Sequence, residues 1–425
     1  MNWKAPVVLL IGLLLLEGVV TAVPFDKPEA VPLATVKALA LRELHKFPEF
    51  NGAIPTNPTP LYFPDGRLAA YEFRMVKNGK TIGYIIVSAN RNLPPAILEA
   101  GFGEKTPSDL MKELATRKGV KTYRPAYFSG LNYGILTGDK IVDMKGREYR
   151  KPSRYTLALE NKAEDNQKQW VTVETLTSTD KIDYIAPLAT ITSQKIIYGV
   201  PAWTSTDLGT KSNIPQPRDA DPWEYIGPAE DPWKDWDGCA PIAASMIVGY
   251  YEIQYRSDWY REAIIDILHR TMKTSDDIEA RTATSNIGPG IENFYWEAKE
   301  VLPDPPRYLY TTTTYNDLNE NSVFSIIKNE VDMGRPGILS AYHFNFVNEL
   351  PVNDFHSVTF AGYREYSDGT RYIYVHTTWA PWLNGRPTSD WVIVDSLPGA
   401  TIVTVKPNSC PSGICPTSLE EVPRK

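Results

Sequence analysis

The chain has 425 residues, of which 42% are hydrophobic and 22% are charged. This composition is typical of a globular protein with a substantial core, and it excludes a disordered or fibrous chain. At roughly 150 residues per domain, the length predicts two or three folded units. The net charge of -7 argues against a broad surface for nucleic-acid phosphates, so we expect no nucleic-acid partner.

The N-terminal segment predicts export. Residues 1–22 carry Lys4, an apolar stretch from Val7 to Leu16 and a small-residue ending at Ala22, a pattern typical of a signal peptide cleaved after Ala22. Glu17 ends the apolar stretch well short of the roughly 20 residues that cross a bilayer. We therefore expect a secreted, extracellular protein that has no membrane association once the signal is removed.

Export exposes thiols to oxidation, so the three cysteines pose a pairing question. Cys410 and Cys415 are separated by the turn-forming spacer Pro-Ser-Gly-Ile in a C-terminal tail with little apolar sequence, which predicts a small disulfide. Cys239 is then the odd thiol. An unpaired cysteine in an exported protein is either buried and inert or kept reduced because it reacts.

The front of the exported chain predicts a helix followed by an antiparallel meander, in which Pro64-Asp65-Gly66 and Asn78-Gly79 are hairpin signals. We see no catalytic constellation in this part of the chain. The predicted elements are a helix over 31–47, strands over 60–63, 68–76 and 81–89, a helix over 107–117, and strand-like pieces over 123–188.

The back of the chain differs in composition, since nine of the eleven tryptophans and all three cysteines follow Ile197. Residues 202–237 are rich in Pro, Asp and Trp and predict an extended loop. Residues 240–301 are helical in pattern, whereas residues 336–406 predict one strand after another. The fold class expected here is α+β, with one helical lobe and one antiparallel β lobe.

Cys239 stands at the first turn of a predicted helix. Gly238 precedes it, Pro241 follows it, and apolar residues continue at helical spacing through Tyr250. A helix N-terminus and a neighbouring imidazolium both stabilise a thiolate, which is the nucleophilic form of cysteine. We therefore predict a reactive Cys239, against the alternative of an inert small hydrophobe packed under a helix cap.

A thiol nucleophile needs an imidazole that accepts its proton and returns it to the leaving amine. His356 opens the apolar strand His-Ser-Val-Thr-Phe-Ala-Gly-Tyr, which would hold the ring at the edge of a β lobe, and we predict it as the partner of Cys239. His343, at a strand end before a loop, is a second candidate. His45 and His269 belong to helical stretches and are expected at the surface.

These segments of the back half resemble a papain-like cysteine peptidase, closest to the double-glycine-leader (bacteriocin-processing) peptidases and to streptopain. The resemblance covers about residues 196–406, and the motif around Cys239 is its specific part. The front half resembles streptopain-like propeptides more weakly, through Tyr71-Glu-Phe and Gly83-Tyr-Ile-Ile-Val87. The matching segments are Ile197–Trp203, Asp237–Met246, Gly334–Ile338 and His356–Tyr363.

The resemblance implies a papain-like two-lobe peptidase preceded by an α+β propeptide and made as a zymogen. The propeptide would cover the cleft as an inhibitor until processing between Ala186 and Ile197. Together with the signal peptide over 1–22 and the tail with the small disulfide over 409–425, predicted above from the residues, the resemblance gives an inhibitory propeptide over 23–196 and a peptidase domain over 197–408.

Two positions depart from the family pattern. The family has Asn or Asp at the end of the strand that follows the catalytic-histidine strand; His376 fills that place here, and we predict that it orients His356. The family also has a Gln that donates to the oxyanion beside the backbone N–H of the nucleophile, here Cys239. The matching position is Ser205, and Gln216 in the long loop is the other candidate.

The sequence therefore predicts a secreted, monomeric thiol endopeptidase with protein or peptide substrates and no metal or cofactor. The acidic stretches Asp219–Asp221 and Asp231–Asp237 have the oxygen ligands that Ca²⁺ prefers, but Trp233 stands where a calcium loop needs a ligand, which favours a solvated loop. Two alternatives stay open: a cell-wall peptide or amide hydrolase with a Cys-His-His triad, and a catalytically inert papain-like binding module.

Overall fold

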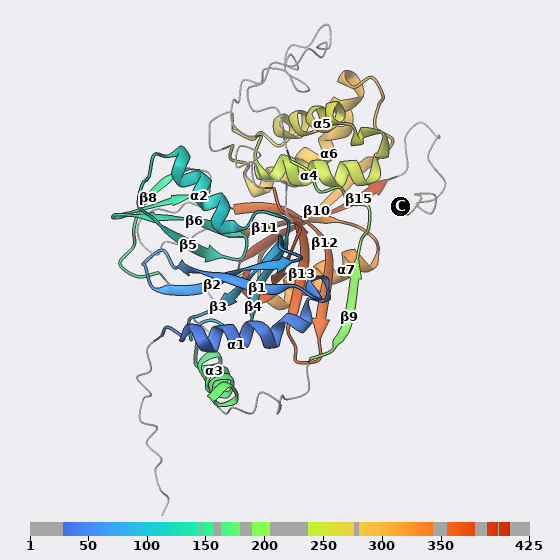
Figure 1. Cartoon of the computed structure of the whole chain (residues 1–425). Helices are drawn as coiled ribbons and strands as arrows, with labels where there is room; N and C mark the ends of the chain where they lie inside the picture. Colours follow the sequence, from blue (N-terminus) through green and yellow to red (C-terminus); the bar gives the residue numbers. More distant parts are fainter. Residues whose placement is uncertain are drawn as a thin grey trace, which may run out of the picture.

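The computed structural model describes residues 29–144, 146–155, 163–178, 189–204, 237–275, 280–342, 355–378, 389–397 and 399–408. Within these ranges the strands join into one large sheet that helices flank (Figure 1). We refer to α1 through α3 as the front half and to β9 through β15 as the back half. No helix in the described ranges combines the length and the apolar character needed to cross a membrane.

The front half contains α1 (Leu33–Glu43), β1 (Ile54–Tyr62), β2 (Leu68–Lys77), β3 (Lys80–Ser88), β4 (Ile97–Phe102), α2 (Pro107–Arg117), β5 (Arg124–Ser129), β6 (Asn132–Thr137), β7 (Lys140–Asp143), β8 (Glu148–Arg150) and α3 (Ala163–Ser178). The back half contains β9 (Ile191–Ile196), α4 (Cys239–Tyr251), α5 (Asp258–Thr271), α6 (Thr284–Val301), β10 (Leu309–Leu318), α7 (Glu320–Asp332), β11 (Gly337–Tyr342), β12 (Phe355–Tyr366), β13 (Arg371–His376), β14 (Ser389–Ile393) and β15 (Ala400–Asn408).

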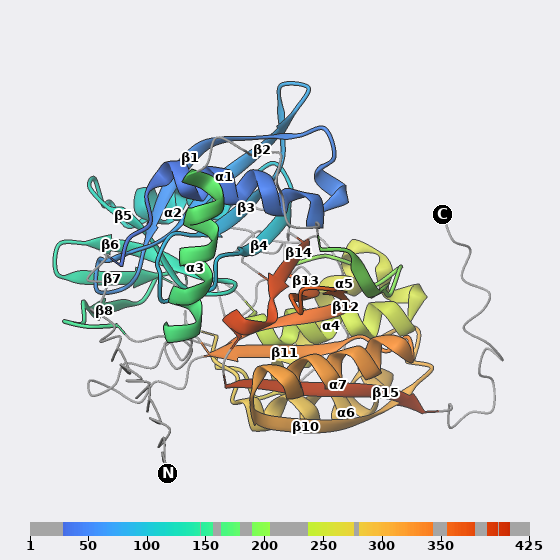
Figure 2. The same ribbon diagram turned by 90° about the horizontal axis from the view of Figure 1, so that it is seen from below.

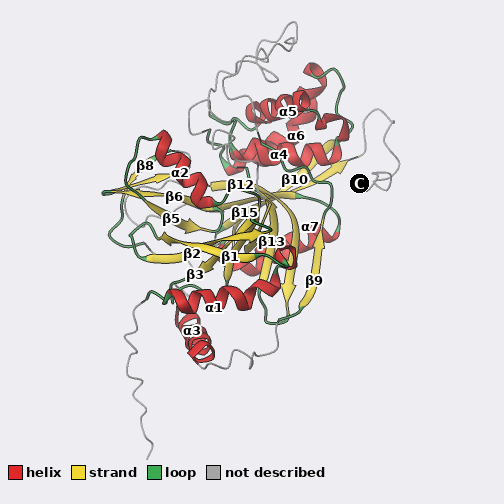
Figure 3. Cartoon of the chain, viewed as in Figure 1, coloured by secondary structure: helices red, strands yellow, loops and turns green. Residues whose placement is uncertain are grey.

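The strand order is β10-β15-β11-β12-β13-β14-β4-β3-β2-β1-β5-β6-β7-β8, and β9 pairs with β12. The described pairs are antiparallel except for a parallel contact between β1 and β5. Helices α4, α5 and α6 lie together on one side of the molecule, whereas α1 and α3 lie on the opposite side (Figure 3). The predicted α+β class is confirmed.

Local sequence signals predict much of the front half correctly. The Asn78-Gly79 turn joins β2 to β3, with φ of 52° at Asn78 and 76° at Gly79, as a tight hairpin requires. Helix α2 has the predicted bounds. The strand-like prediction for 123–188 is wrong for residues 163–178, which form α3. Trp170 of this polar helix is fully buried and donates its Nε1–H to the Leu93 carbonyl at 2.8 Å, so tertiary packing selects the helix.

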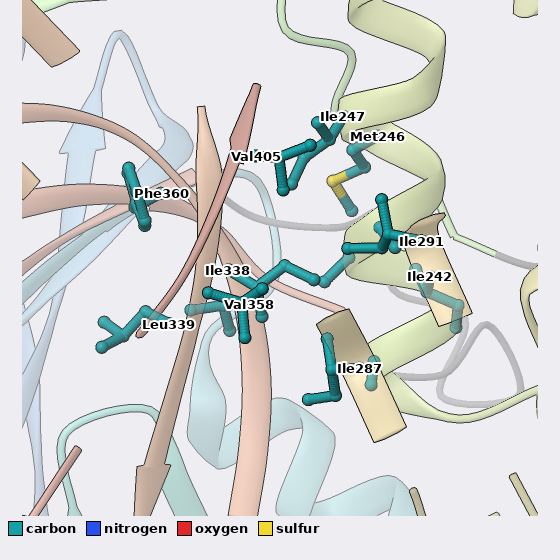
Figure 4. Close-up of a cluster of buried hydrophobic side chains, with 14 of the residues drawn as sticks. Ile242, Met246, Ile247, Ile287, Ile291, Ile338, Leu339, Val358, Phe360 and Val405 are labelled. Atoms are coloured by element: carbon teal, nitrogen blue, oxygen red, sulfur yellow. The ribbon is translucent and has the colours of Figure 1, made fainter. Parts of the chain in front are cut away.

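In the back half, α4 begins at Cys239 as predicted, and the strand-rich pattern beyond residue 336 is confirmed by β11 through β15. β10 and α7 have no counterpart among the predicted elements. Apolar side chains of α4 and α6 pack against the sheet and seat the first turns of α4 over β11 and β12 (Figure 4). The labelled members of this core are Ile242, Met246, Ile247, Ile287, Ile291, Ile338, Leu339, Val358, Phe360 and Val405.

The two halves share one sheet because β14 pairs with β4, with Trp391 opposite Ala100 (Figure 2). The hydrophobic core of the front half also includes four side chains of the back half, namely Tyr366, Tyr372, Trp391 and Ile393. We call this contact the junction. The predicted layout of a two-lobe peptidase with a separate propeptide is not confirmed, because the front strands continue the sheet of the back half.

A buried arginine connects the halves at the junction. Arg364 of β12 is 1% exposed, and its Nη2 donates to Glu49 Oε1 at 2.7 Å while its Nη1 donates to the Lys46 carbonyl at 2.8 Å. The guanidinium lies 4.2 Å from the ring centroid of Trp391, whose Nε1–H also donates to Glu49 Oε1 at 3.0 Å. The buried guanidinium of the back half thus binds two polar groups of the front half, the Glu49 carboxylate and the Lys46 carbonyl.

A second polar cluster crosses the junction between β3, β4 and β14. Tyr84 and Asp390 both pair with Gly101, so the three residues form one row across three strands. Because Gly101 has no side chain, the Tyr84 hydroxyl reaches over it and lies 2.6 Å from Glu99 Oε1 and 3.1 Å from Asp390 Oδ2. Burial raises the pKa of the Glu99 carboxyl. Position 101 therefore has no room for a side chain.

Candidate active site

The turn before α4 presents Cys239 as the first residue of the helix. Gly238 has φ of 96° and ψ of 148°, a conformation that side-chain-bearing residues rarely adopt, and its carbonyl accepts from the Ile242 N–H at 3.3 Å. A Cβ at position 238 would lie 2.8 Å from the Ala280 carbonyl oxygen. Cys239 is a reduced thiol and is 5% exposed. Position 238 therefore requires glycine, which is part of the motif found in the sequence.

Helix α4 packs along β12 and runs in the same direction. Near its middle, the Thr359 hydroxyl donates to the Ala243 carbonyl at 2.8 Å. Farther along the helix, the Tyr250 hydroxyl donates to the Gly334 carbonyl at 3.3 Å, just before β11. β11 in turn begins opposite the residue that follows Thr359 in β12. The C-terminal end of α4 therefore lies toward the later residues of β12.

Cys239 and His356 consequently lie at the same end of this packing. Cys239 precedes Ala243 by about one helical turn, or roughly 6 Å along the axis. His356 precedes Thr359 by three residues, or roughly 10 Å along the strand. Both predicted residues are buried at the start of their elements. The structure thus brings them to one end of α4 and β12, while direct contact between the sulfur and the imidazole stays a prediction.

The lead-in segment after β9 contacts α4 through a tryptophan. Trp203 Nε1–H donates to the Ser245 hydroxyl at 2.7 Å, and that hydroxyl donates to the Ile242 carbonyl at 2.7 Å. The Trp203 ring fills the space where a side chain at Gly249 would stand. The Trp203 segment is therefore packed on α4 and helps to fix it.

The structure does not bring His376 to His356. His376 pairs with Thr359, so it lies roughly 10 Å along the strand from the position beside His356. Its Nδ1 lies 2.7 Å from the Ser389 hydroxyl. Burial lowers the pKa of His376 to about 4, and a hydrogen bond with the Val200 backbone acts in the opposite direction. Burial therefore keeps this imidazole neutral, and its described hydrogen bonds are with Ser389 and the Val200 backbone and do not include His356.

The buried His376 is expected to lower the free energy of unfolding of the protein in acid. Because its pKa falls from 6.5 to about 4 on folding, its stabilisation is fully present above pH 6.5 and is lost as the pH falls toward 4. The variant His376→Gln, which does not titrate, should lose less unfolding free energy than the wild type between pH 7 and pH 4, by about 3 kcal/mol at most. Urea unfolding of both proteins at the two pH values measures this difference. An equal loss in both proteins would contradict the assignment.

The residue that sequence reasoning missed at this strand end is Thr378. It is fully buried, and its hydroxyl donates to the Ser357 carbonyl at 2.7 Å, so it follows β13 directly across from the residue after His356. Thr378 is identified by the antiparallel register of β12 and β13, in which residues nearer the end of β13 lie nearer the start of β12. From the sequence alone, that register was not fixed.

Of the two histidines predicted at the surface, one is exposed and the other is buried. His45 is exposed, as expected, and its Nε2 lies 3.0 Å from the Ala189 carbonyl. The expectation of a surface position for His269 is wrong: it is 0% exposed, and its Nδ1 lies 2.8 Å from the Asp237 carbonyl. Its charged neighbour Arg270 suggested a solvated face, whereas the i, i+4 and i+7 spacing from Glu262 places His269 on the buried face of α5.

Several predicted residues lie outside the described ranges: Ser205, Gln216, His343, Cys410, Cys415, and the acidic stretches before Asp237. The Cys239 backbone N–H opens α4, where the first N–H groups have no intrahelical acceptor, which suits an oxyanion donor. Within the described ranges, no three His, Cys, Asp or Glu side chains gather so as to hold a metal ion. The oxyanion partner and the small disulfide stay predictions.

Comparisons with known proteins gave a distant structural likeness. No family model and no curated protein matches the chain. Among solved structures, a fragment of prointerpain A from Prevotella intermedia, solved as a cysteine-to-alanine mutant, is similar at 10% identity and a TM-score of 0.37. The match covers 82% of this chain and 98% of that one. A likeness of this degree does not establish a shared family, and the support for a function comes from the residues of this chain.

Proposed function

We propose that this chain is a thiol endopeptidase whose nucleophile is Cys239 and whose general base and acid is His356. The observation that carries the proposal is the placement of Cys239. It follows an obligatory glycine, opens a buried helix, and lies at the same end of the α4–β12 packing as His356. An N-terminal helix position favours a thiolate and directs backbone N–H groups at an oxyanion.

The proposed chemistry proceeds in two steps. His356 takes the proton of the Cys239 thiol, the sulfur attacks the peptide carbonyl carbon, and the resulting oxyanion accepts from the Cys239 backbone N–H. His356 gives this proton to the leaving amine as the C–N bond breaks and a thioester forms. His356 then takes a proton from the water that attacks the thioester and returns it to the sulfur as the C–S bond breaks, which releases the acid and the thiol.

We further propose that the chain is exported and made in a latent form. The segment 1–22 supports export. The low exposure of Cys239 supports latency, since a buried thiol is not open to substrate. Because residues 191–196 are hydrogen-bonded to β12, processing fits best before β9, between Ala186 and Ile191.

Incubation of purified full-length protein with casein and with peptidoglycan tests the reaction class. We expect casein to be cut to peptides, with iodoacetamide stopping the reaction. Clearing of peptidoglycan alone would instead assign a cell-wall hydrolase. If neither substrate is cut and Cys239 alkylates at pH 6 no faster than a model thiol, the chain is an inert binding module.

A matched pair of histidine variants tests the assignment of the base. His356→Ala should lower kcat for casein by at least about 100-fold, because general acid–base catalysis contributes on that order. His45→Ala changes an exposed histidine of the front half and should leave kcat within about twofold of wild type. Circular dichroism verifies that both variants fold. Equal rates for the two variants would remove His356 from the mechanism.

A further inference from the structure

A side chain of helix α5 contacts the turn that precedes Cys239. His269, in the last turn of α5, is fully buried, and its Nδ1 lies 2.8 Å from the Asp237 carbonyl oxygen. A carbonyl oxygen can only accept, so Nδ1 carries the proton of this bond. The bonded carbonyl belongs to the peptide between Asp237 and Gly238, which directly precedes Cys239. One imidazole therefore fixes the orientation of the peptide plane that leads into the nucleophile.

The loop after α5 closes on the same turn. The Thr274 N–H donates to the His269 carbonyl at 2.9 Å, and the Thr274 and Thr282 hydroxyls lie 2.7 Å apart. This loop places the Ala280 carbonyl 2.8 Å and the Thr274 methyl 3.1 Å from where a Cβ of Gly238 would stand. The Asp237–Gly238 peptide is thus held at its carbonyl by His269, and Gly238 is enclosed by Thr274 and Ala280, which follow α5.

We propose that His269 is a positioning residue for Cys239. It acts through the Asp237 carbonyl, by fixing the turn whose geometry sets the direction of the Cys239 side chain and of its backbone N–H. This inference rests on the proposed function, in which sulfur and N–H act on the same substrate carbonyl. A misplacement of about 1 Å at such a centre can lower the rate on the order of 100-fold.

Two amide variants of His269 separate positioning from packing. In His269→Asn the amide nitrogen stands two bonds from Cβ, as Nδ1 does, so it can donate to the Asp237 carbonyl. In His269→Gln the amide is one carbon farther out and overshoots that position. Ile267→Val shortens a buried apolar side chain of the same helix and serves as the control for a general loss of packing in α5.

The full-length variants are compared by kcat and KM for casein and by the rate of Cys239 alkylation with iodoacetamide from pH 5 to pH 9. For His269→Gln we expect kcat to fall at least tenfold with KM within twofold, together with a changed pH profile of alkylation. His269→Asn should restore both to within about threefold of wild type, and Ile267→Val should change neither. A folded His269→Gln protein with wild-type kcat and wild-type alkylation overturns the proposal.

If His269→Gln fails to fold, a measurement on the wild-type protein tests the proposal instead. In protein labelled with ¹⁵N-histidine, the His269 ring should show a protonated Nδ1, and a neutral ring protonated only at Nε2 overturns the proposal. The alkylation data also distinguish failure of the peptidase assignment from failure of the positioning role of His269. If wild type cuts no peptide but His269→Gln still alters Cys239 alkylation and His269→Asn restores it, the peptidase assignment falls and the positioning role stands.

Discussion

Replacing Cys239 by alanine is expected to abolish both peptide hydrolysis and self-processing. Loss of the nucleophile of a hydrolase lowers kcat by a factor on the order of 10⁴ or more. The wild type should shorten itself by about 165 residues after signal removal, because we expect the cut between Ala186 and Ile191, whereas Cys239→Ala should keep the front half. Casein cleavage and N-terminal sequencing of both proteins measure the two effects.

The matched control for this experiment removes the other thiols. A protein with Cys410→Ala and Cys415→Ala keeps Cys239 as its single cysteine and should retain hydrolysis and processing. Circular dichroism should show that Cys239→Ala folds, because the exchange removes only one buried sulfur atom. Casein cleavage by Cys239→Ala at the wild-type rate would show that the chemistry belongs to another residue.

Replacing Arg364 by methionine is expected to weaken the junction. Methionine can still cover the Trp391 ring, but the Glu49 carboxylate and the Lys46 carbonyl lose their buried donor. Glu49 keeps part of its solvent contact, so the loss of unfolding free energy should be about 2–3 kcal/mol, below the cost of stranding a fully buried charge. Urea unfolding measures the loss, and faster amide exchange in β4 and β14 shows where it acts.

Arg335→Met is the control for this change. Arg335 makes a two-contact ion pair with Glu330 at 2.7 and 2.8 Å, but both residues belong to the back half and the arginine side chain is 24% exposed. Its loss should cost about 1 kcal/mol or less and leave exchange in β4 and β14 unchanged. Equal destabilisation by both substitutions would mean that Arg364 has no special role at the junction.

Where a short stretch of sequence decides the local structure, the prediction succeeded. The Asn78-Gly79 hairpin, the bounds of α2 and the start of α4 at Cys239 each depend on residues within a few positions of one another. The obligatory glycine before Cys239 is of the same kind, because its φ of 96° excludes most other residues. The position of Cys239 at the start of α4 was therefore predictable.

Where distant contacts decide the structure, the prediction failed. Helix α3 is polar and follows a strand-rich region, and contacts with distant residues, such as the buried Trp170 that donates to the Leu93 carbonyl, accompany its helical conformation. His269 resembles a surface residue beside Arg270, yet its partner Asp237 is 32 positions away. The register that pairs His376 with Thr359 follows from the whole ladder of β12 and β13. None of these contacts leaves a local trace in the sequence.

The backbone hydrogen bonds between β4 and β14 keep the two halves associated after a cut before β9. Hydrolysis before β9 breaks one covalent bond and none of the backbone hydrogen bonds from Ser389 through Val392. The first product is then a nicked pair of polypeptides that stay associated, and separation becomes an equilibrium that dilution or a competing extended peptide can shift. The back half would thus be liberated by dissociation, on its own timescale, after proteolysis is complete.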